Sequence, residues 1–322
     1  MAGSSDGGPG VAPYGSGAGQ AGARRDGGAS RARPALAGGG RSVSSLQRSA
    51  REEVVTLATD APPIRCSANV AFLFPDRPLV AALEAAAEAG FHTVELLDPY
   101  VIPPPELGAA LERLGLHVDL MNLPFGDFAR GDRGFAGDPG RRAEFRRAAL
   151  LAEALAQQVS PAKVNVLAGR AVAGIPLDEQ LACLRENLAF AAARFLPAGI
   201  RVVTELLNRV ETPGFLLGDV GTVQALLEDL GGRVGFQLDV YHLQRSGGEL
   251  IPTIRALAPR TWHVQVADAP GRSEPGTGEI NVPNVLRAIQ TAGYGGLVGL
   301  EYRPTGAGDP FAWMAAAGCV PA

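Results

Sequence analysis

The sequence contains little lysine, few cysteines and no long apolar run, and each shortage excludes a class of protein. Its 29 basic residues include a single lysine, Lys163, which lies at the start of a predicted strand and is a poor candidate for Schiff-base chemistry. The three cysteines, Cys66, Cys183 and Cys319, lie far apart, without a CxxC pair or zinc-site spacing, which indicates a reduced, cytoplasmic setting. No apolar run approaches the roughly 18 residues that a membrane-spanning helix needs, so no membrane partner is expected.

An excess of charge of either sign is also missing. The formal net charge is -4 and the isoelectric point is about 5.7, so nothing suggests nucleic acid or another polyanion as a partner. The 322 residues, 46% of them hydrophobic, are enough for one large domain or two small ones. We therefore expect a small molecule as the partner, and the sequence leaves open whether the chain forms a homo-oligomer.

Residues 1–62 have a different composition from the rest of the chain. Residues 1–50 hold 13 glycines and six arginines, with Asp6 and Asp26 as their only acidic residues. Such a segment buries too little apolar surface to offset the entropy of ordering it, so we predict a disordered leader. A transit peptide is the alternative, but the glycines would break the amphipathic helix that it requires. A start codon assigned too far upstream also fits.

Residues 63–322 alternate between apolar, β-rich runs and helical patterns that begin with proline or aspartate and end with glycine. The predicted strands are residues 65–73, 92–97, 117–123, 162–168, 200–207, 233–240, 261–267 and 297–302. The predicted helices include residues 78–90, 105–115, 142–158, 178–195 and 218–231. Eight strands separated by helices over about 250 residues predict an α/β fold, the (β/α)8 TIM barrel. A doubly wound sheet is the rival, but no glycine-rich fingerprint follows the first strand.

Polar side chains stand at the ends of four consecutive predicted strands. Glu205, Asp239, Gln265 and Glu301 end or nearly end strands five to eight. The carboxyl ends of barrel strands meet at one rim, where active sites lie, so these side chains should converge. Three carboxylates and an amide oxygen that close would repel one another without a cation, and an all-oxygen set suits Mg²⁺ or Mn²⁺ better than Zn²⁺. The alternative for any one of them, Asp239 above all, is a helix N-cap or an ion pair.

Eight motifs can be recognised along the chain: SANVAFLFPD (67–76), GFHTVELLDPY (90–100), NLPFGDFARGDRGFAGDPGR (122–141), LAGR (167–170), ELLNRVETPGF (205–215), FQLDVYHLQ (236–244), HVQVADAPGRSEPGTGEIN (263–281) and GLEYRPTG (299–306). Together they resemble the hydroxypyruvate isomerase family of xylose isomerase-like TIM barrels. They extend from about residue 66 to the C-terminus. One departure is Leu206, where the family usually has proline after the first glutamate. The leader is also outside the family pattern.

The resemblance implies a metal-dependent isomerase that interconverts hydroxypyruvate and tartronate semialdehyde through an enediolate. It places the metal ligands on Glu205, Asp239, Gln265 and Glu301, and the two acid/base groups on Glu205 and Glu301. A 2-oxo-tetronate isomerase would use the same residues. A related ketose epimerase is less well matched, because that family tends to place histidine where Gln265 stands. From another class, a barrel that binds a metal or sugar acid without turnover remains open.

Neighbouring residues are candidates for substrate binding. Arg272 has the planar fork that matches a substrate carboxylate, and His242 could donate a hydrogen bond to a substrate oxygen. Glu211 could bind a hydroxyl group, although a surface role fits its position equally well. Gln237 and His263 lie two residues before predicted ligands and could hold those ligands in place. Glu95 could line the pocket from the end of strand two.

Overall fold

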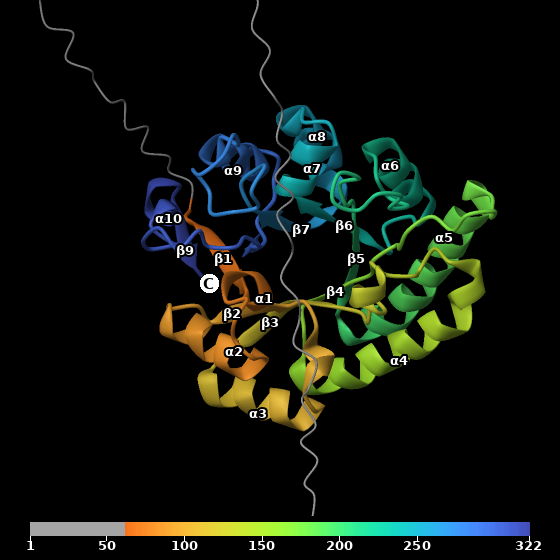
Figure 1. The fold of residues 1–322 in the computed structure, drawn as a ribbon, viewed down its shortest axis with the longest axis horizontal. Coiled ribbons are helices and arrows are strands. Elements are labelled where there is room, and N and C mark those ends of the chain that lie inside the picture. The colour runs from red at the N-terminus through yellow and green to blue at the C-terminus, as the bar shows by residue number, and fades with distance from the viewer. Residues whose placement is uncertain (1–61) are drawn as a thin grey trace, which may run out of the picture. The chain divides into compact units, whose positions relative to one another are not determined.

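The computed structural model describes residues 62–322, so the predicted leader lies outside the described residues except for Pro62. Eight parallel strands follow one another around a closed barrel, with β1 paired to both β8 and β2 (Figure 1). The strands are β1 (Ile64–Asn69), β2 (Thr93–Leu96), β3 (His117–Asn122), β4 (Lys163–Asn165), β5 (Arg201–Glu205), β6 (Gly235–Asp239), β7 (Thr261–Val266) and β8 (Val298–Leu300). The predicted TIM barrel is confirmed, and each predicted strand overlaps an observed one.

The helices surround the barrel on its outside (Figure 1). The longer ones are α2 (Leu79–Glu88), α3 (Pro104–Leu114), α4 (Arg142–Val159), α5 (Leu177–Phe195), α6 (Val220–Asp229), α8 (Leu250–Leu257) and α9 (Val282–Thr291). Their ends follow the expected local rules. Helix α3 begins with proline and ends at Gly115 in the left-handed conformation (φ 64°), while Asp219 caps α6 by accepting a hydrogen bond from the Thr222 N–H (2.9 Å).

The first predicted strand is too long. Residues 65–73 were expected to form one strand, but β1 ends at Asn69 and Val70–Leu73 forms a short helix, α1. A short apolar run fits either structure, because periodicity cannot distinguish a buried strand from one turn of buried helix. The early end matters for the site, because it leaves Asn69 at the carboxyl end of the strand.

A ninth strand, β9 (Cys319–Pro321), was not predicted. It pairs in parallel with the first half of β1. Next to it, the Ala322 N–H donates a hydrogen bond to the Cys66 carbonyl, and the Ala322 carbonyl accepts one from the His92 N–H. Three residues with a proline among them carry no strand signal of their own, so the pairing is a tertiary effect. Within residues 62–322, no helix is both long and apolar enough to cross a membrane.

Alternate residues of each strand face the inside of the barrel, and many of those residues are polar. The outward residues pack against the helices and form the apolar core, which includes Val94, Val164, Val202, Leu238 and Val264. The buried polar residues of the strands include Ser67, Asn69, Glu95, Asp119, Lys163, Asn165, Glu205, Gln237, Asp239, His263 and Gln265. The barrel is therefore filled largely by hydrogen-bonded and charged side chains.

Candidate active site

The four predicted ligands lie where their strands end. Glu205 and Asp239 are the last residues of β5 and β6, Gln265 is next to last in β7, and Glu301 directly follows β8. Each is at most 6% exposed. In a parallel barrel these positions share one end, so the residues lie around the mouth at which such folds hold their active sites.

On one side of the mouth, a single amide joins two of these residues. The side-chain nitrogen of Gln237 donates to Glu205 Oε2 (3.0 Å) and to Gln265 Oε1 (2.7 Å). Glu205, Asp239 and His242 each offer a possible ligand atom, and these three atoms lie within 4.8 Å of one another. Glu205, Asp239 and Gln265 thus gather at one place, as the strand ends predict.

On the other side, Arg272 joins the remaining pair. Its Nη2 atom lies 3.3 Å from Asp239 Oδ2 and also forms a close ion pair with Glu301 Oε2. The second oxygen of Glu301 accepts a hydrogen bond from the Asn69 side chain (3.0 Å). All four predicted ligands are therefore brought to one polar cluster, and sequence reasoning missed Asn69.

The cluster carries more negative than positive charge. Burial, together with the nearby charge of Asp239, raises the pKa of Glu205 to about 7. Burial also raises the pKa of Asp239, and it raises the pKa of Glu301 well above its ordinary range, with Asp239 and Glu205 adding to the effect. Three buried carboxylates facing one guanidinium are stabilised by a further cation. The chemistry of this donor set therefore fits a divalent metal ion.

His242 lies in the first turn of helix α7 (Val240–Ser246), directly after the end of β6. Its Nδ1 atom accepts a hydrogen bond from the Asn208 backbone N–H (3.1 Å), which leaves the proton on Nε2. Burial lowers the pKa of His242 well below its usual value, so the ring is neutral. Nε2 lies 3.6 Å from Asp239 Oδ2 and faces the cluster.

Asp239 caps helix α7, the role that the sequence offers as the alternative to metal binding, and it does so with one of its two oxygens. Its Oδ1 atom caps helix α7 by accepting from the backbone N–H groups of Tyr241 (2.7 Å) and His242 (3.4 Å). Its Oδ2 atom faces Arg272. The cap holds the carboxylate in one orientation and leaves the second oxygen for the site.

Arg272 is held tightly for a residue on a loop. Its guanidinium lies over the rings of Phe72 (4.4 Å) and Tyr241 (4.9 Å), and its backbone adopts a positive φ of 53°. Its carbonyl accepts a hydrogen bond from the Arg303 N–H (2.9 Å). These contacts hold the planar, charged guanidinium at the mouth of the barrel, beside Asp239 and Glu301.

The loop that carries Arg272 is organised by Asp268, which sequence reasoning did not single out. Asp268 Oδ1 accepts from the backbone N–H groups of Ala269 and Ile280, and Oδ2 accepts from those of Gly276 and Gly278 (2.8–2.9 Å). The side chain is only 1% exposed. One carboxylate therefore ties both ends of residues 268–280 together. In the sequence, this role is indicated by an aspartate that directly precedes a Gly/Pro-rich loop.

Replacing Asp268 with alanine should destabilise the protein and release Arg272. At least two of the four donors, Ala269 and Ile280, belong to buried residues, and a hydrogen bond to a charged group contributes about 1.5–3 kcal/mol, so we expect a loss of about 3 kcal/mol or more. Urea unfolding measures this loss, and KM for the substrate should rise because the loop no longer holds Arg272. Asp268→Asn retains one acceptor oxygen and should have an intermediate effect. Unchanged stability in the alanine variant would contradict the anchoring role.

Glu211 lies at the outer edge of the site. Its side chain is exposed, its carboxylate accepts a close hydrogen bond from the Tyr241 hydroxyl, and its backbone N–H donates to Asn208 Oδ1 (2.9 Å). Through Tyr241 it supports the aromatic surface on which Arg272 rests. The structure thus brings Glu211 near the predicted carboxylate-binding residue.

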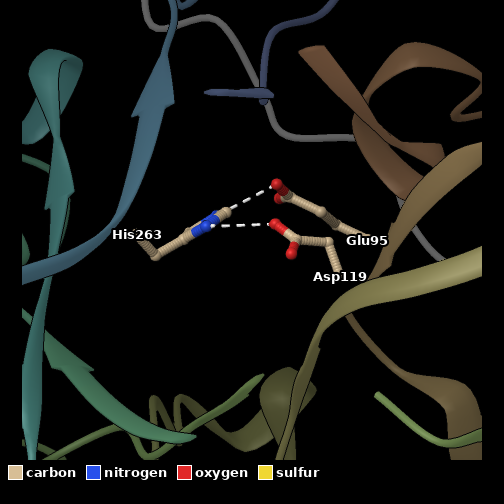
Figure 2. Close-up of side chains that lie close together, drawn as sticks. All are labelled: Glu95, Asp119 and His263. Atoms are coloured by element: carbon tan, nitrogen blue, oxygen red, sulfur yellow. Dashed lines mark ion pairs between the residues drawn. The ribbon is translucent and has the colours of Figure 1, made fainter. Parts of the chain in front are cut away.

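Below the mouth, a second charged cluster fills the barrel. Glu95 and Asp119, from β2 and β3, point across the barrel toward His263 of β7 (Figure 2). His263 Nε2 lies 3.0 Å from Glu95 Oε1, and Nδ1 lies 3.4 Å from Asp119 Oδ2. Lys163 Nζ forms a buried ion pair with Asp119 (2.6 Å). The sequence suggests that Glu95 could line the pocket. In the structure it lies inside the barrel instead.

Comparisons with known proteins agree with the TIM-barrel fold. Residues 83–317 match the family described as "Xylose isomerase-like TIM barrel". The chain is 41% identical over 244 residues to hydroxypyruvate isomerase of Escherichia coli, covering 75% of this chain and 94% of that protein. It is 35% identical over 256 residues to 2-oxo-tetronate isomerase of Cupriavidus necator, covering 78% and 97%.

Among solved structures, one described as AP endonuclease, family 2, from Brucella melitensis superposes with a TM-score of 0.74 at 33% identity. The match covers 79% of this chain and 98% of that one. The chain therefore belongs to the xylose isomerase-like TIM barrel family. Within that family it is an isomerase, similar to the hydroxypyruvate and 2-oxo-tetronate isomerases.

Proposed function

We propose that this isomerase interconverts hydroxypyruvate and 2-hydroxy-3-oxopropanoate (tartronate semialdehyde) and depends on a divalent metal. The observation that carries the proposal is the convergence of Glu205, Asp239, Gln265 and Glu301 on one buried cluster at the mouth of the barrel. The similarity to hydroxypyruvate isomerase of Escherichia coli over nearly its full length supports the choice of substrate.

Glu205, Asp239, Gln265 and Glu301 would hold the metal through oxygen atoms, which favours Mg²⁺ or Mn²⁺. When bound, such an ion stabilises the negative charge that develops on the substrate oxygens during the reaction. Gln237 and Asn69 would keep the ligands Glu205 and Glu301 in place, since each donates a hydrogen bond to one of those carboxylates.

Glu205 and Glu301 would carry out the proton transfers. One carboxylate removes a proton from C3 of hydroxypyruvate, which gives an enediolate, and the other delivers a proton to C2. The hydroxyl proton passes from O3 to O2, so the product has the same atoms with the carbonyl group at C3. A pKa of about 7 for Glu205 suits a group that must both accept and release a proton near neutral pH.

The remaining predicted residues would bind the substrate. Arg272, held over two aromatic rings, would pair with the substrate carboxylate in place of its present contacts with Asp239 and Glu301. Neutral His242 would donate its Nε2 proton to a substrate oxygen, and Glu211 would accept a hydroxyl group at the entrance. We also place the enzyme in the cytoplasm, since Cys66, Cys183 and Cys319 are all free thiols.

A 2-oxo-tetronate isomerase is the second candidate, supported by the 35% identity to the Cupriavidus necator enzyme. The four-carbon acid presents the same carboxylate, ketone and neighbouring hydroxyl-bearing carbon, so the same residues would act on it. A ketose epimerase is less well supported, because Gln265 stands where we expect a histidine in that family.

Proton exchange in D₂O tests the proposal and separates it from a barrel that only binds. The purified protein is mixed with Mg²⁺ or Mn²⁺ and either hydroxypyruvate or 2-oxo-tetronate, and deuterium is followed by NMR. We expect deuterium at C3 or C2 of the preferred substrate and product formation that requires the metal. Binding of both acids without exchange or product would contradict an isomerase and favour a binding protein.

A further inference from the structure

The amide of Gln265 has two chemically different ends, and the structure fixes which end faces the site. Its nitrogen donates to Glu95 Oε2 (2.7 Å), and its oxygen accepts from the Gln237 nitrogen (2.7 Å). A carboxylate offers only acceptors, so it selects the nitrogen end of the amide. With the nitrogen directed to Glu95, the oxygen is left on the side of Gln237 and Glu205.

Glu95 is itself held from several sides. Its Oε1 atom accepts a hydrogen bond from the Ser67 hydroxyl (2.7 Å). The same atom lies 3.0 Å from His263 Nε2, an ion pair that Figure 2 shows. His263 in turn faces Asp119, which Lys163 neutralises. Glu95 and His263 are fully buried, and Asp119 and Lys163 are 5% and 6% exposed. A rigid group of this kind can impose an orientation on its neighbour, because none of its members is free to turn toward water.

The barrel also provides space for this carboxylate. Gly299 lies in β8. A Cβ atom added at this position would lie 2.0 Å from Glu95 Oε1. Any side chain at that position would push the carboxylate away from Ser67 and Gln265. The absence of a side chain at Gly299 thus has a defined use, which is to admit the Glu95 head group into the barrel.

The Glu95, Asp119 and His263 atoms lie within 4.8 Å of one another, which also raises the question of a second metal site. Lys163 answers it, because its ammonium group already bonds to Asp119 at 2.6 Å. A second cation there would meet that charge at close range. Burial alone would lower the pKa of His263, but Glu95 and Asp119 raise it above its usual value. The cluster already contains a cation of its own, the Lys163 ammonium group.

We propose that Glu95 is a positioning residue, which orients the Gln265 amide so that its oxygen faces the metal site. The inference rests on the proposed function in one respect, that Gln265 is a metal ligand. It adds a second role inside the barrel. The four proposed ligands bind the metal, and the charged cluster of Glu95, Asp119, His263 and Lys163 beneath them determines which end of the Gln265 amide faces it. Gly299 contributes to this positioning, because it leaves room for the Glu95 carboxylate.

Exchanging the two side chains tests the polarity directly. Mn²⁺ is titrated into metal-free protein, and the dissociation constant is read from the electron paramagnetic resonance of free Mn²⁺. Glu95→Gln presents either end of an amide to Gln265, so the orientation is no longer fixed by a carboxylate. Gln265→Glu adds a fourth carboxylate to the site and places it face to face with Glu95. Loss of a group that supports a ligand weakens metal binding about 10- to 100-fold, which we expect for Glu95→Gln.

The double variant E95Q/Q265E restores a donor facing an acceptor and has the same net charge as the wild type. We expect it to bind Mn²⁺ at least as tightly as the wild type, because the carboxylate at position 265 again has a donor beneath it and an oxygen toward the site. A double variant that binds as weakly as E95Q, or a dissociation constant within twofold of wild type for E95Q, would overturn the proposal. Gly299→Ala displaces Glu95 without changing its charge and should also weaken Mn²⁺ binding about 10-fold.

Two further variants separate this inference from the proposed function. Gln265→Ala tests the ligand itself: if it leaves Mn²⁺ affinity unchanged, the proposed ligand set fails, whatever Glu95 does. If Gln265→Ala weakens binding and E95Q does not, only the positioning role fails. Thr204→Val is the matched control, because it removes a buried hydroxyl of β5 that bonds to the Val166 carbonyl (2.8 Å) and not to the site. Circular dichroism melting confirms that each variant is folded.

Discussion

Replacing either Glu205 or Glu301 with glutamine should lower kcat by about 10²- to 10⁴-fold, the usual contribution of a general acid or base. The amide keeps the size of the side chain but cannot take a proton from carbon. The glutamine oxygen can still accept one of the hydrogen bonds that each carboxylate receives, such as those from Asn165 to Glu205 Oε1 (2.7 Å) and from Asn69 to Glu301 Oε1 (3.0 Å), so the variants should remain folded. Steady-state kinetics with hydroxypyruvate at saturating metal gives the measurement.

Metal occupancy must be known in this experiment, because both glutamates are also proposed ligands. Mn²⁺ content is therefore measured in the same samples, and kcat is compared only between loaded proteins. Glu153→Gln serves as the control, since this residue lies on helix α4 and pairs with Arg194 on the outside of the barrel. Near-normal turnover in either loaded site variant would remove that glutamate from the proton transfer.

Chelation should abolish turnover and lower thermal stability together. A ligand present at 100 times its dissociation constant stabilises the folded state by about 2.7 kcal/mol. For a domain of this size, that corresponds to a rise in the melting temperature of roughly 5–10 °C. The physical cause is the excess of buried negative charge at Glu205, Asp239 and Glu301, which a cation offsets. Differential scanning fluorimetry with EDTA and then with Mg²⁺, Mn²⁺ or Zn²⁺ measures the shift.

The control for chelation is Asp239→Asn, which removes one charge from the cluster. The melting temperature of this variant should respond less to added metal than that of the wild type. Removing the metal should also lower its stability less, because fewer like charges then face one another. Asp239 also caps helix α7, and asparagine is an equally good cap, so the helix should be retained. Full activity of the wild-type protein after complete removal of metal would contradict the metal-dependent reaction.

The sequence predicted the barrel and the convergence of the four residues for the same reason. Parallel strands bring their carboxyl ends together, so a polar residue at the end of each of four strands is placed by topology alone. Glu205, Asp239, Gln265 and Glu301 could thus be grouped without knowing any distance. Arg272 and His242 could be predicted as substrate-binding candidates because they follow those strand ends along the chain.

Contacts between residues distant in sequence could not be predicted in this way. The bond between Gln265 and Glu95 joins positions 170 residues apart, and its polarity depends on rotamers that the sequence does not encode locally. Asp268 looks like any loop aspartate until its four backbone donors are seen. Strand β9 forms because β1 has an unpaired half, and a tripeptide does not reveal that. In each case tertiary structure decides a feature that local propensity leaves open.

The polar filling of the barrel has a consequence for protein engineering. Replacing a buried ion pair such as Lys163 and Asp119 by well-packed apolar residues often stabilises a protein, so a library selected for heat resistance alone should accumulate such changes. Those changes would remove the support of His263 and Glu95, and through them the proposed setting of Gln265. Heat-selected descendants of this enzyme should therefore lose catalytic power before they lose their shape, the usual trade-off between stability and activity.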